Sequence, residues 1–370
     1  MKAIKASFEG VAKGVLHVAS WNWKPYSRMI LYGEKAEWVL DWEMRELANT
    51  CERLGVKIAN PIWKHAAQPQ SFFFSNHFIL LNGGWQKLLP GRIGFSYFHG
   101  LPDTGYALFD DFYKLLRQHH EHFTRIQVSH SQMLDLTLGT GIDPSKVFLI
   151  PIGINVDFFP FRTVEQKQSA RSELGISSSA FVVGSFQKDG VGWEEGLEPK
   201  LIKGPDVFLS TMELLKKDVG SDLFVLLSGP SRGYVKRGLE QLQIPYKHLY
   251  IKSYPDVAKL FQASDAYLVA SRQEGGPKAI LESMASGVPI ITTRVGQAMD
   301  LVKHGVNGWM ADVEDAESLA RYILQSRNME QDALMAILRN GRATAEANTY
   351  ASQFPLWTEF MKGFVEINQH

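Results

Sequence analysis

Short apolar runs alternate with longer amphipathic stretches along most of the chain. In the second half, the apolar runs that predict buried strands lie at residues 181–186, 223–228, 249–252, 266–270 and 289–292. The helical patterns between and after them lie at residues 205–217, 233–242, 255–263 and 277–286, within 316–340, and at 350–367. Strands that alternate with helices are typical of a parallel sheet, so we predict a doubly wound α/β domain here.

The first half shows the same alternation less regularly. Strands are predicted at residues 15–20, 93–98, 126–129 and 147–150. Helices are predicted at residues 34–54, 108–122 and 131–138. A turn-rich segment, residues 151–157, follows the last of these strands and marks the expected boundary between two α/β domains.

The composition fits a soluble globular enzyme. With 370 residues, of which 45% are hydrophobic and 21% charged, the chain can build two cores. Lys and Arg together number 39, as do Asp and Glu, so no overall charge attracts nucleic acid. Cys51 is the single cysteine, no apolar run could span a bilayer, and the N-terminus lacks a signal-peptide core. We expect a cytoplasmic protein, with peripheral contact at the inner face of the membrane left open.

The stretch from Glu274 to Glu282 carries the strongest chemical signal. Its sequence, EGGPKAILE, follows an apolar run, and Pro277 suits the first position of the helical pattern. Gly275 and Gly276 would let the backbone approach a ligand closely and take positive φ. An open helix N-terminus favours an anion such as a phosphate. Because one carboxylate stands on each side of that pocket, the stretch suits a nucleotide sugar, which has hydroxyl groups on both sides of a diphosphate.

Two further side chains are expected near this pocket. Lys203 opens the helical pattern that begins near residue 205, where a lysine can meet a diphosphate as a point charge. Alone it would be interpreted as a surface residue, but the glutamate pair favours the diphosphate contact. His99 follows a strand-like run, so it should stand at the carboxyl edge of the first sheet. There it could donate to a sugar hydroxyl or to developing negative charge, with a hydrogen-bonded core position as the alternative.

Other groups give weaker signals. The polar segment 187–202, which carries Lys188, is expected to be solvated and mobile. His119 and His122 crowd around Glu121, but a metal needs further ligands with matching geometry, so a solvated helix end is preferred. Six tryptophans in the first 85 residues either fill a core or offer a face for an acceptor. Correctly spaced dinucleotide, P-loop, nucleophile-elbow and zinc-protease motifs are missing, so those chemistries are not indicated.

With these motifs in view, the chain resembles the retaining glycosyltransferases of family 4, which have the GT-B fold. The resemblance is strongest over residues 264–308, which contain SDA at 264–266, the E-x7-E signature at 274–282, SMASGVP at 283–289 and the start of VNGW at 306–309. The segments SHS at 129–131 and IPIGIN at 150–155 resemble the end of the family's first domain. Residues 1–90 carry little of the pattern.

The resemblance implies two Rossmann-like, doubly wound domains that face a cleft. Residues 1–152 would form the acceptor-side domain and residues 153–345 the domain that binds the nucleotide-sugar donor. Residues 346–370 would form a helix that packs back on the first domain. The family's arginine after the first strand of the second domain is replaced here by SFQK, and Lys188 is the expected substitute. The family's glycine-rich first loop is not visible near residues 20–27.

The resemblance also implies a role for each candidate residue. Glu282 would hold the ribose hydroxyls, whereas Glu274 and His99 would lie at the transferred sugar. Lys203 and Lys188 would bind the diphosphate. Sugar and phosphate oxygens would also meet backbone N–H groups of the turn formed by Gly275, Gly276, Pro277 and Lys278. The expected catalytic residues are therefore His99, Lys203 and Glu274, and neither a metal nor a cofactor is expected.

The implied activity is transfer of a hexose or related sugar with retention of the anomeric configuration. The donor would be a nucleotide diphosphate sugar, and the acceptor a glycan, a lipid-linked molecule or another hydroxyl compound, in polysaccharide or glycoconjugate biosynthesis. One alternative is a nucleotide-sugar 2-epimerase of the same fold, which should carry additional acidic residues in the first-domain cleft. Another is a sugar-binding protein with a decayed site.

Overall fold

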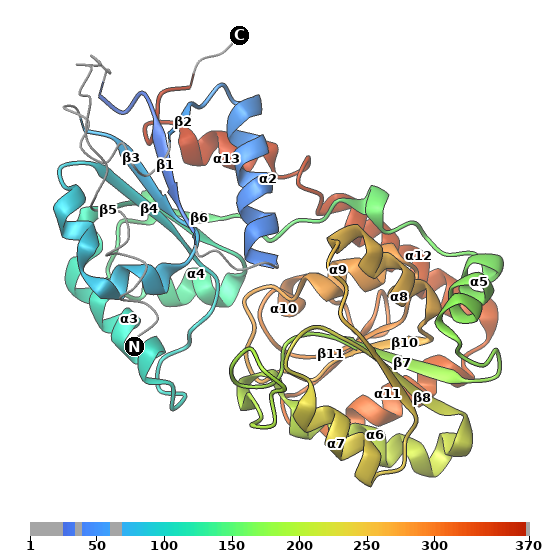
Figure 1. Cartoon of the computed structure of the whole chain (residues 1–370). Coiled ribbons are helices and arrows are strands. Elements are labelled where there is room, and N and C mark those ends of the chain that lie inside the picture. Colours follow the sequence, from blue (N-terminus) through green and yellow to red (C-terminus); the bar gives the residue numbers. More distant parts are fainter. Residues whose placement is uncertain (1–24, 34–38, 60–68, 368–370) are drawn as a thin grey trace, which may run out of the picture.

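The computed structural model describes residues 25–33, 39–59 and 69–367, which form two α/β lobes (Figure 1). Among these residues, each lobe contains a six-stranded sheet whose strand pairs are all parallel. In spatial order the first sheet is β2 (Ile58–Ala59), β1 (Met29–Tyr32), β3 (Ser71–Phe74), β4 (Arg92–Tyr97), β5 (Phe123–Val128) and β6 (Val147–Leu149). The second is β12 (Trp309–Ala311), β11 (Ile290–Thr293), β10 (Ala266–Val269), β7 (Phe181–Phe186), β8 (Leu223–Ser228) and β9 (Tyr246–Leu249).

Helices cover both faces of each sheet. Those of the first lobe are α2 (Val39–Arg53), α3 (Ala107–His119), α4 (Ser131–Leu138) and the late-returning α13 (Phe354–Met361). Those of the second lobe are α5 (Val164–Leu174), α6 (Pro205–Val219), α7 (Gly233–Gln241), α8 (Val257–Ala263), α9 (Lys278–Ala285), α10 (Ala298–Leu301), α11 (Ala316–Asn328) and α12 (Gln331–Ala347). On β7, Val182 packs into the core on one face and Val183 into the core on the other, because successive strand residues point to opposite sides. A strand buried on both faces therefore reads as a continuous apolar run.

The order of the second sheet indicates where a ligand would bind. The first strand of this lobe, β7, lies in the middle, with β8 and β9 on one side and β10 to β12 on the other. In doubly wound sheets, ligands bind beyond the carboxyl ends of the strands where the order reverses, which here is between β7 and β10. Lys203 follows β7 and the Glu274 turn follows β10, so the topology brings these two sequence signals together.

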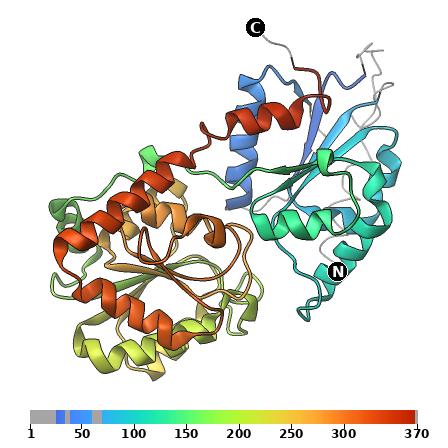
Figure 2. The ribbon, with the colours of Figure 1, turned by 180° about the vertical axis from the view of Figure 1, so that it is seen from behind.

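The chain leaves the first lobe after β6 and returns to it after α12 (Figure 2). On its return, α13 packs against α2, because Trp357 and Phe360 share one core cluster with Leu47 and Phe73. Arg125 Nε of β5 also donates a 3.0 Å hydrogen bond to the Phe360 carbonyl. The two parallel sheets and the helix that crosses back to the first lobe confirm the predicted fold class.

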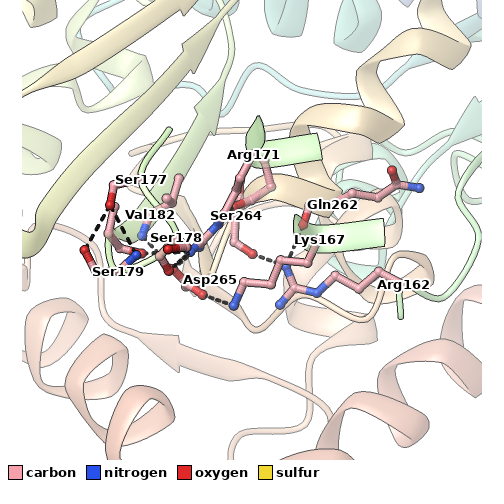
Figure 3. Close-up of polar contacts among 12 residues, drawn as sticks. Arg162, Lys167, Arg171, Ser177, Ser178, Ser179, Val182, Gln262, Ser264 and Asp265 are labelled. Carbon is pink, nitrogen blue, oxygen red and sulfur yellow. Dashed lines mark hydrogen bonds and ion pairs between the residues drawn. The ribbon is translucent and has the colours of Figure 1, made fainter. Parts of the chain in front are cut away.

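Helix α5, which the sequence analysis missed, attaches the outgoing connection to the second lobe. Figure 3 shows Asp265, just before β10, between Lys167 and Arg171 of α5, with which it forms ion pairs. Asp265 Oδ2 also accepts a 2.7 Å hydrogen bond from the Val182 N–H. Burial alone would raise the pKa of Asp265, but Lys167 and Arg171 outweigh burial and lower the pKa. The charged carboxylate therefore fixes α5 to the start of two central strands.

Several predicted elements differ from the observed ones. The strand predicted at 249–252 was misplaced, since β9 ends at Leu249. The helix predicted at 350–367 is shorter, and a break at Met329 and Glu330 separates α11 from α12. Short strands β1, β3 and β12 were not predicted, because runs of three or four residues carry little periodicity. The strand predicted at 15–20 and the first residues of the helix predicted at 34–54 lie outside the described residues.

In the parts of the chain that the structure describes, no helix has both the length and the apolar character to cross a bilayer.

Candidate functional site

Lys203 and Glu274 meet at the switch point of the second sheet. Lys203 Nζ lies 2.6 Å from Glu274 Oε2, and Ser271 Oγ donates a 2.8 Å hydrogen bond to the other carboxylate oxygen. Lys203 ends the short 3-10 helix η7 (Leu201–Lys203), and the next residue, Gly204, has φ of 62°. A Cβ on Gly204 would lie 1.9 Å from the Ala270 carbonyl oxygen, so only glycine allows the close approach of this segment to the end of β10.

Two more lysines stand near this ion pair. Burial, Lys203 and Lys188 lower the pKa of Lys200, whereas Glu274 opposes the shift, so these charges are close enough to interact. Lys188 Nζ lies 3.8 Å from the centroid of the Trp193 ring, a cation–π contact, and burial lowers its pKa. Lys200 was missed from the sequence, although its position three residues before Lys203 was a usable signal. Lys188 thus interacts with Lys200, and its place at the diphosphate end stays a prediction.

The Glu274 turn has the open helix N-terminus that the sequence predicted, with two corrections. Pro277 is the N-cap residue rather than the first helical residue, with ψ of 106°, and no side chain caps α9. Gly275 and Gly276 do not have positive φ. Their missing side chains instead accommodate the first lobe, since a Cβ on Gly275 would lie 2.7 Å from Phe98 Cβ and one on Gly276 would lie 2.7 Å from Ile152 Cδ1. The backbone N–H groups at the start of α9 remain suited to an anion.

The first lobe therefore touches this turn directly. Ser129 Oγ, after β5, donates a 3.0 Å hydrogen bond to the Gly275 carbonyl oxygen. The Gln297 side chain accepts from the Ile152 N–H and donates to the Ile152 carbonyl, both at 3.0 Å. The carboxyl edges of the two sheets consequently face each other at the Glu274 turn.

His99 comes from the first lobe and faces the same charges. His99 is half-buried as a residue, and its ring packs edge-on to His77 and Phe109. Burial and the nearby Lys203 lower the pKa of His99 to about 4, against the opposing effect of Glu274. The imidazole is therefore neutral at physiological pH and can donate or accept a hydrogen bond without adding charge. His99 lies at the carboxyl edge of the first sheet, as predicted.

His130, in the SHS segment at 129–131, is a second imidazole of this region. It is buried, and burial lowers its pKa, whereas Asp300 and the Phe98 carbonyl favour the protonated form. Neither ring nitrogen makes a hydrogen bond of good geometry with the described residues. His130 is the N-cap residue of α4, and the next residue, Ser131, donates its N–H to Asp300 of the second lobe at 2.8 Å.

Glu282 lies on α9 at the other end of the candidate site. It is buried, and its Oε1 accepts a 2.6 Å hydrogen bond from the Tyr254 hydroxyl. Burial raises the pKa of Glu282, although Lys278 and Tyr254 favour the charged form. Tyr254 begins the 3-10 helix η9 (Tyr254–Asp256), and sequence reasoning missed it, because nothing in a single tyrosine after a strand indicates its partner.

The Lys278 side chain points away from the Glu274 turn and contacts α2 and the returning connection. Its Nζ lies 2.6 Å from Oε1 of Glu43 on α2, and it also bonds to the Tyr350 hydroxyl. Only its backbone N–H, at the start of α9, is available for the role that the resemblance implied.

The segment 187–202 is more ordered than its polarity suggested. The Asp189 side chain is fully buried, with Arg232 Nε at 3.0 Å. Backbone hydrogen bonds also fix it, from Val191 N–H to Glu198 O at 2.9 Å and from Gly233 N–H to Glu195 O at 2.6 Å. The expected solvent exposure is confirmed for most of residues 191–200, whereas a buried ion pair and an antiparallel bridge between Gly190 and Pro199 hold the base of the segment.

His119, Glu121 and His122 form the one group of three potential metal ligands found among the described residues. Their ligand atoms lie within 4.8 Å of one another, and Glu121 and His122 are exposed. The rings of both histidines contact Trp85. This group lies at the end of α3, and none of its members takes part in the hydrogen bonds and ion pairs of the Glu274 turn.

Comparison with known proteins bears on this second lobe. Residues 197–343 match the model of the family "Glycosyl transferases group 1". The matched segment contains Lys203, Glu274 and Glu282, so these three candidate donor residues lie within the part of the chain that is similar to the group 1 glycosyltransferases, whereas Lys188 precedes it.

Curated relatives are similar over part of the chain. D-inositol 3-phosphate glycosyltransferase of Corynebacterium urealyticum is 26% identical over 250 residues, which cover 64% of this chain and 54% of the relative. N-acetyl-alpha-D-glucosaminyl L-malate synthase of Bacillus anthracis is 29% identical over 140 residues, which cover 36% of this chain and 37% of that enzyme. The chain thus matches from 37% to 54% of the length of these two relatives.

Solved structures are similar over nearly the whole chain. Alr3699/HepE of Anabaena, in complex with UDP and glucose, has a TM-score of 0.72 and 15% identity, covering 91% of this chain and 99% of the other. Sucrose-phosphate synthase of Thermosynechococcus elongatus has a TM-score of 0.72 and 14% identity, covering 91% of this chain and 98% of that enzyme. At these identities the likeness concerns the fold, and it confirms the two-domain GT-B fold.

Proposed function

We propose that this protein is a glycosyltransferase that takes a sugar from a nucleotide diphosphate sugar. The observation that carries the proposal is the Lys203–Glu274 ion pair, 2.6 Å long, at the switch point of the second sheet and next to the uncapped start of α9. A cation, a carboxylate and a helix N-terminus at one crevice suit a diphosphate joined to a sugar. The family match of residues 197–343 supports the same reading.

Each residue of the site then has a physical task. The lysines at 188, 200 and 203 and the start of α9 stabilise the charge that develops on the departing diphosphate. Glu274 accepts hydrogen bonds from hydroxyls of the transferred sugar, and Glu282 accepts them from the ribose. Neutral His99 donates to the sugar from the opposite lobe. Closing the cleft around both substrates supplies orientation and excludes water.

The finer features of the reaction are part of the same proposal. Transfer proceeds with retention of configuration, on one face of the sugar, and the departing phosphate helps to deprotonate the acceptor hydroxyl. Lysines and backbone N–H groups replace a metal in neutralising the diphosphate. The acceptor is a glycan, a lipid-linked molecule or another hydroxyl compound, so the protein would act in polysaccharide or glycoconjugate biosynthesis.

The names of the structural neighbours suggest which donor to test first. Anabaena Alr3699/HepE is described in complex with UDP-glucose, and the pneumococcal O-GlcNAc transferase GtfA in complex with UDP and GlcNAc. UDP-glucose and UDP-N-acetylglucosamine therefore head the donor panel, followed by UDP-galactose and the GDP- and ADP-linked sugars.

The test is release of nucleoside diphosphate from each donor, with and without simple sugar acceptors, compared between the wild-type protein and Glu274→Gln. We expect one nucleotide sugar to be turned over by the wild type and far more slowly by the variant. Failure of every donor to bind or react would overturn the enzyme proposal.

The same assay separates the two alternatives. An epimerase would convert the donor sugar without transferring it to an acceptor, which NMR of the product reveals. A sugar-binding protein with a decayed site would bind a nucleotide sugar without releasing nucleotide. Activity that persists in chelator would support metal independence, whereas a strict requirement for added metal would contradict it.

A further inference from the structure

A polar cluster joins α9 to both connections between the lobes. Lys278 Nζ lies 2.6 Å from Glu43 Oε1 on α2 of the first lobe, donates to the Tyr350 hydroxyl, and lies 3.4 Å from the Gly153 carbonyl oxygen. Gly153 belongs to the outgoing connection and Tyr350 to the returning one. The Tyr350 hydroxyl in turn donates a 2.6 Å hydrogen bond to Glu43 Oε1. One ammonium group thus contacts three segments whose relative positions define how the lobes are placed.

The same cluster continues to the ribose end of the candidate site. Glu282 lies four residues after Lys278, on the same face of α9. The hydroxyl of Tyr254 donates to Glu282 Oε1 at 2.6 Å, and Lys278 Nζ lies 5.0 Å from the centroid of the Tyr254 ring. The first lobe reaches this tyrosine too, because the Trp42 ring centroid lies 4.8 Å from that of Tyr254.

Burial makes these contacts depend on one another. The Lys278 side chain is 5% exposed and that of Glu43 is 18% exposed, so neither charge is well hydrated without its partner. The Tyr254 hydroxyl occupies one oxygen of Glu282, while the other accepts no hydrogen bond from a described residue. The carboxylate is therefore oriented by a residue that is itself packed against Trp42 and Lys278.

We propose that Glu43, Lys278 and Tyr254 are positioning residues that make ribose recognition by Glu282 depend on the placement of the first lobe. The inference rests on the proposed function, since it concerns the ribose of a nucleotide donor. With the lobes together, Glu43 and Trp42 hold Lys278 and Tyr254, and Tyr254 directs the second oxygen of Glu282 toward a ribose hydroxyl. When the lobes separate, Glu43 no longer contacts Lys278 and Trp42 no longer contacts Tyr254, so Glu282 loses that orientation. The ligand recognised in this way is a ribonucleoside diphosphate rather than its 2′-deoxy analogue.

The test compares binding of UDP and 2′-deoxy-UDP to the full chain by calorimetry, in the wild type, Glu43→Gln and Glu52→Gln. Glu52 is an exposed residue on the same helix and serves as the matched control. We expect Glu43→Gln to weaken UDP binding about tenfold and 2′-deoxy-UDP binding much less, because Lys278 loses its charged partner and Glu282 loses the orientation on which its ribose contact depends. Glu52→Gln should keep the wild-type affinities and their ratio.

If Glu43 only stabilises the contact between the lobes, the variant gives a different result. In that case Glu43→Gln lowers the melting temperature but leaves the ratio of the two affinities unchanged, and the proposal is overturned. Tyr254→Phe, which keeps the ring, provides a second variant should Glu43→Gln fold poorly. It should lose the same preference for the ribonucleotide, and an unchanged or tighter UDP affinity would contradict the proposal.

The failure of this inference and that of the proposed function can be distinguished. If the wild type binds no nucleoside diphosphate among UDP, GDP and ADP, both are wrong. If it binds GDP or ADP instead, the corresponding 2′-deoxynucleotide replaces 2′-deoxy-UDP. If the wild type prefers the ribonucleotide and both variants retain that preference, the donor site stands and only the coupling to the first lobe is wrong.

Discussion

Lys203 Nζ lies 2.6 Å from Glu274 Oε2, so the lysine that follows β7 and the glutamate that follows β10 form one ion pair. They are 71 residues apart in sequence. Their contact is a direct result of strand order, because β7 and β10 are neighbours at the centre of the second sheet. Under the proposed function, a diphosphate bound by Lys203 would share this lysine with Glu274, and the sugar and phosphate contacts would lie beside each other.

Replacing Lys203 should weaken the donor site without unfolding it. Lys203→Gln removes the charge nearest to Glu274, and we expect kcat/KM to fall about 10- to 100-fold, the range for loss of a charge-assisted hydrogen bond. Nucleotide release under steady-state conditions measures the effect. Lys217→Gln, an exposed lysine on α6, is the control and should behave as the wild type. Equal activity of both variants would remove Lys203 from the site.

The neutral state of His99 predicts the shape of the pH profile. Since burial and Lys203 lower its pKa to about 4, the imidazole does not change charge near its ordinary pKa of about 6.5. His99→Gln should lower kcat by removing a hydrogen bond to the sugar, yet the profile between about pH 5 and 8 should keep its shape. A limb near pH 6.5 that is present in the wild type and absent from this variant would show that His99 titrates there.

Gly275 should not tolerate a side chain, because the first lobe packs directly against it. In Gly275→Ala the new Cβ would lie 2.7 Å from Phe98 Cβ and 2.8 Å from the Phe98 carbonyl oxygen. Because backbone cannot yield as a flexible side chain does, the lobes should move apart, at a cost of about 1–3 kcal/mol. Activity should fall and small-angle scattering should show a larger radius of gyration. Gly84→Ala, whose Cβ meets nothing within 4 Å, is the control.

Asp265 should stabilise the second lobe in a pH-dependent way. Removing this carboxylate in Asp265→Ala leaves Lys167 and Arg171 without their partner, and we expect a loss of about 3–5 kcal/mol in the free energy of unfolding. The folded-state pKa of Asp265 is lowered, so its contribution is present above the unfolded pKa of aspartate. It disappears as pH falls through the folded pKa.

Denaturant unfolding at several pH values checks this prediction. The difference between wild type and Asp265→Ala should shrink on acidification, whereas Asp218→Ala, an exposed position on α6, should change little at any pH. A difference that stays constant with pH would mean that packing rather than charge carries the effect.

The second lobe was the more predictable half of the fold. Its strands β7 and β8 were placed correctly, because central parallel strands are apolar throughout and are bounded by polar turns. The edge strand β9 was misplaced by three residues, since Tyr246–Leu249 is only half-buried and lacks such a run. In the first lobe, strands as short as Met29–Tyr32 gave no periodic signal, and part of that lobe lies outside the described residues.

The sequence by itself determined where the main candidate donor residues stand in the second lobe. Glu274, Glu282, Lys203 and the proline that precedes α9 are defined by local spacing, which fixes which residues stand at a turn and which on a helix. Only the tertiary structure decided what these residues touch. The contacts of Lys278 with Glu43, of Glu282 with Tyr254 and of Gly275 with Phe98 join segments that are distant along the chain. Such contacts depend on strand order and on how the lobes pack, and neither leaves a periodic trace in the sequence.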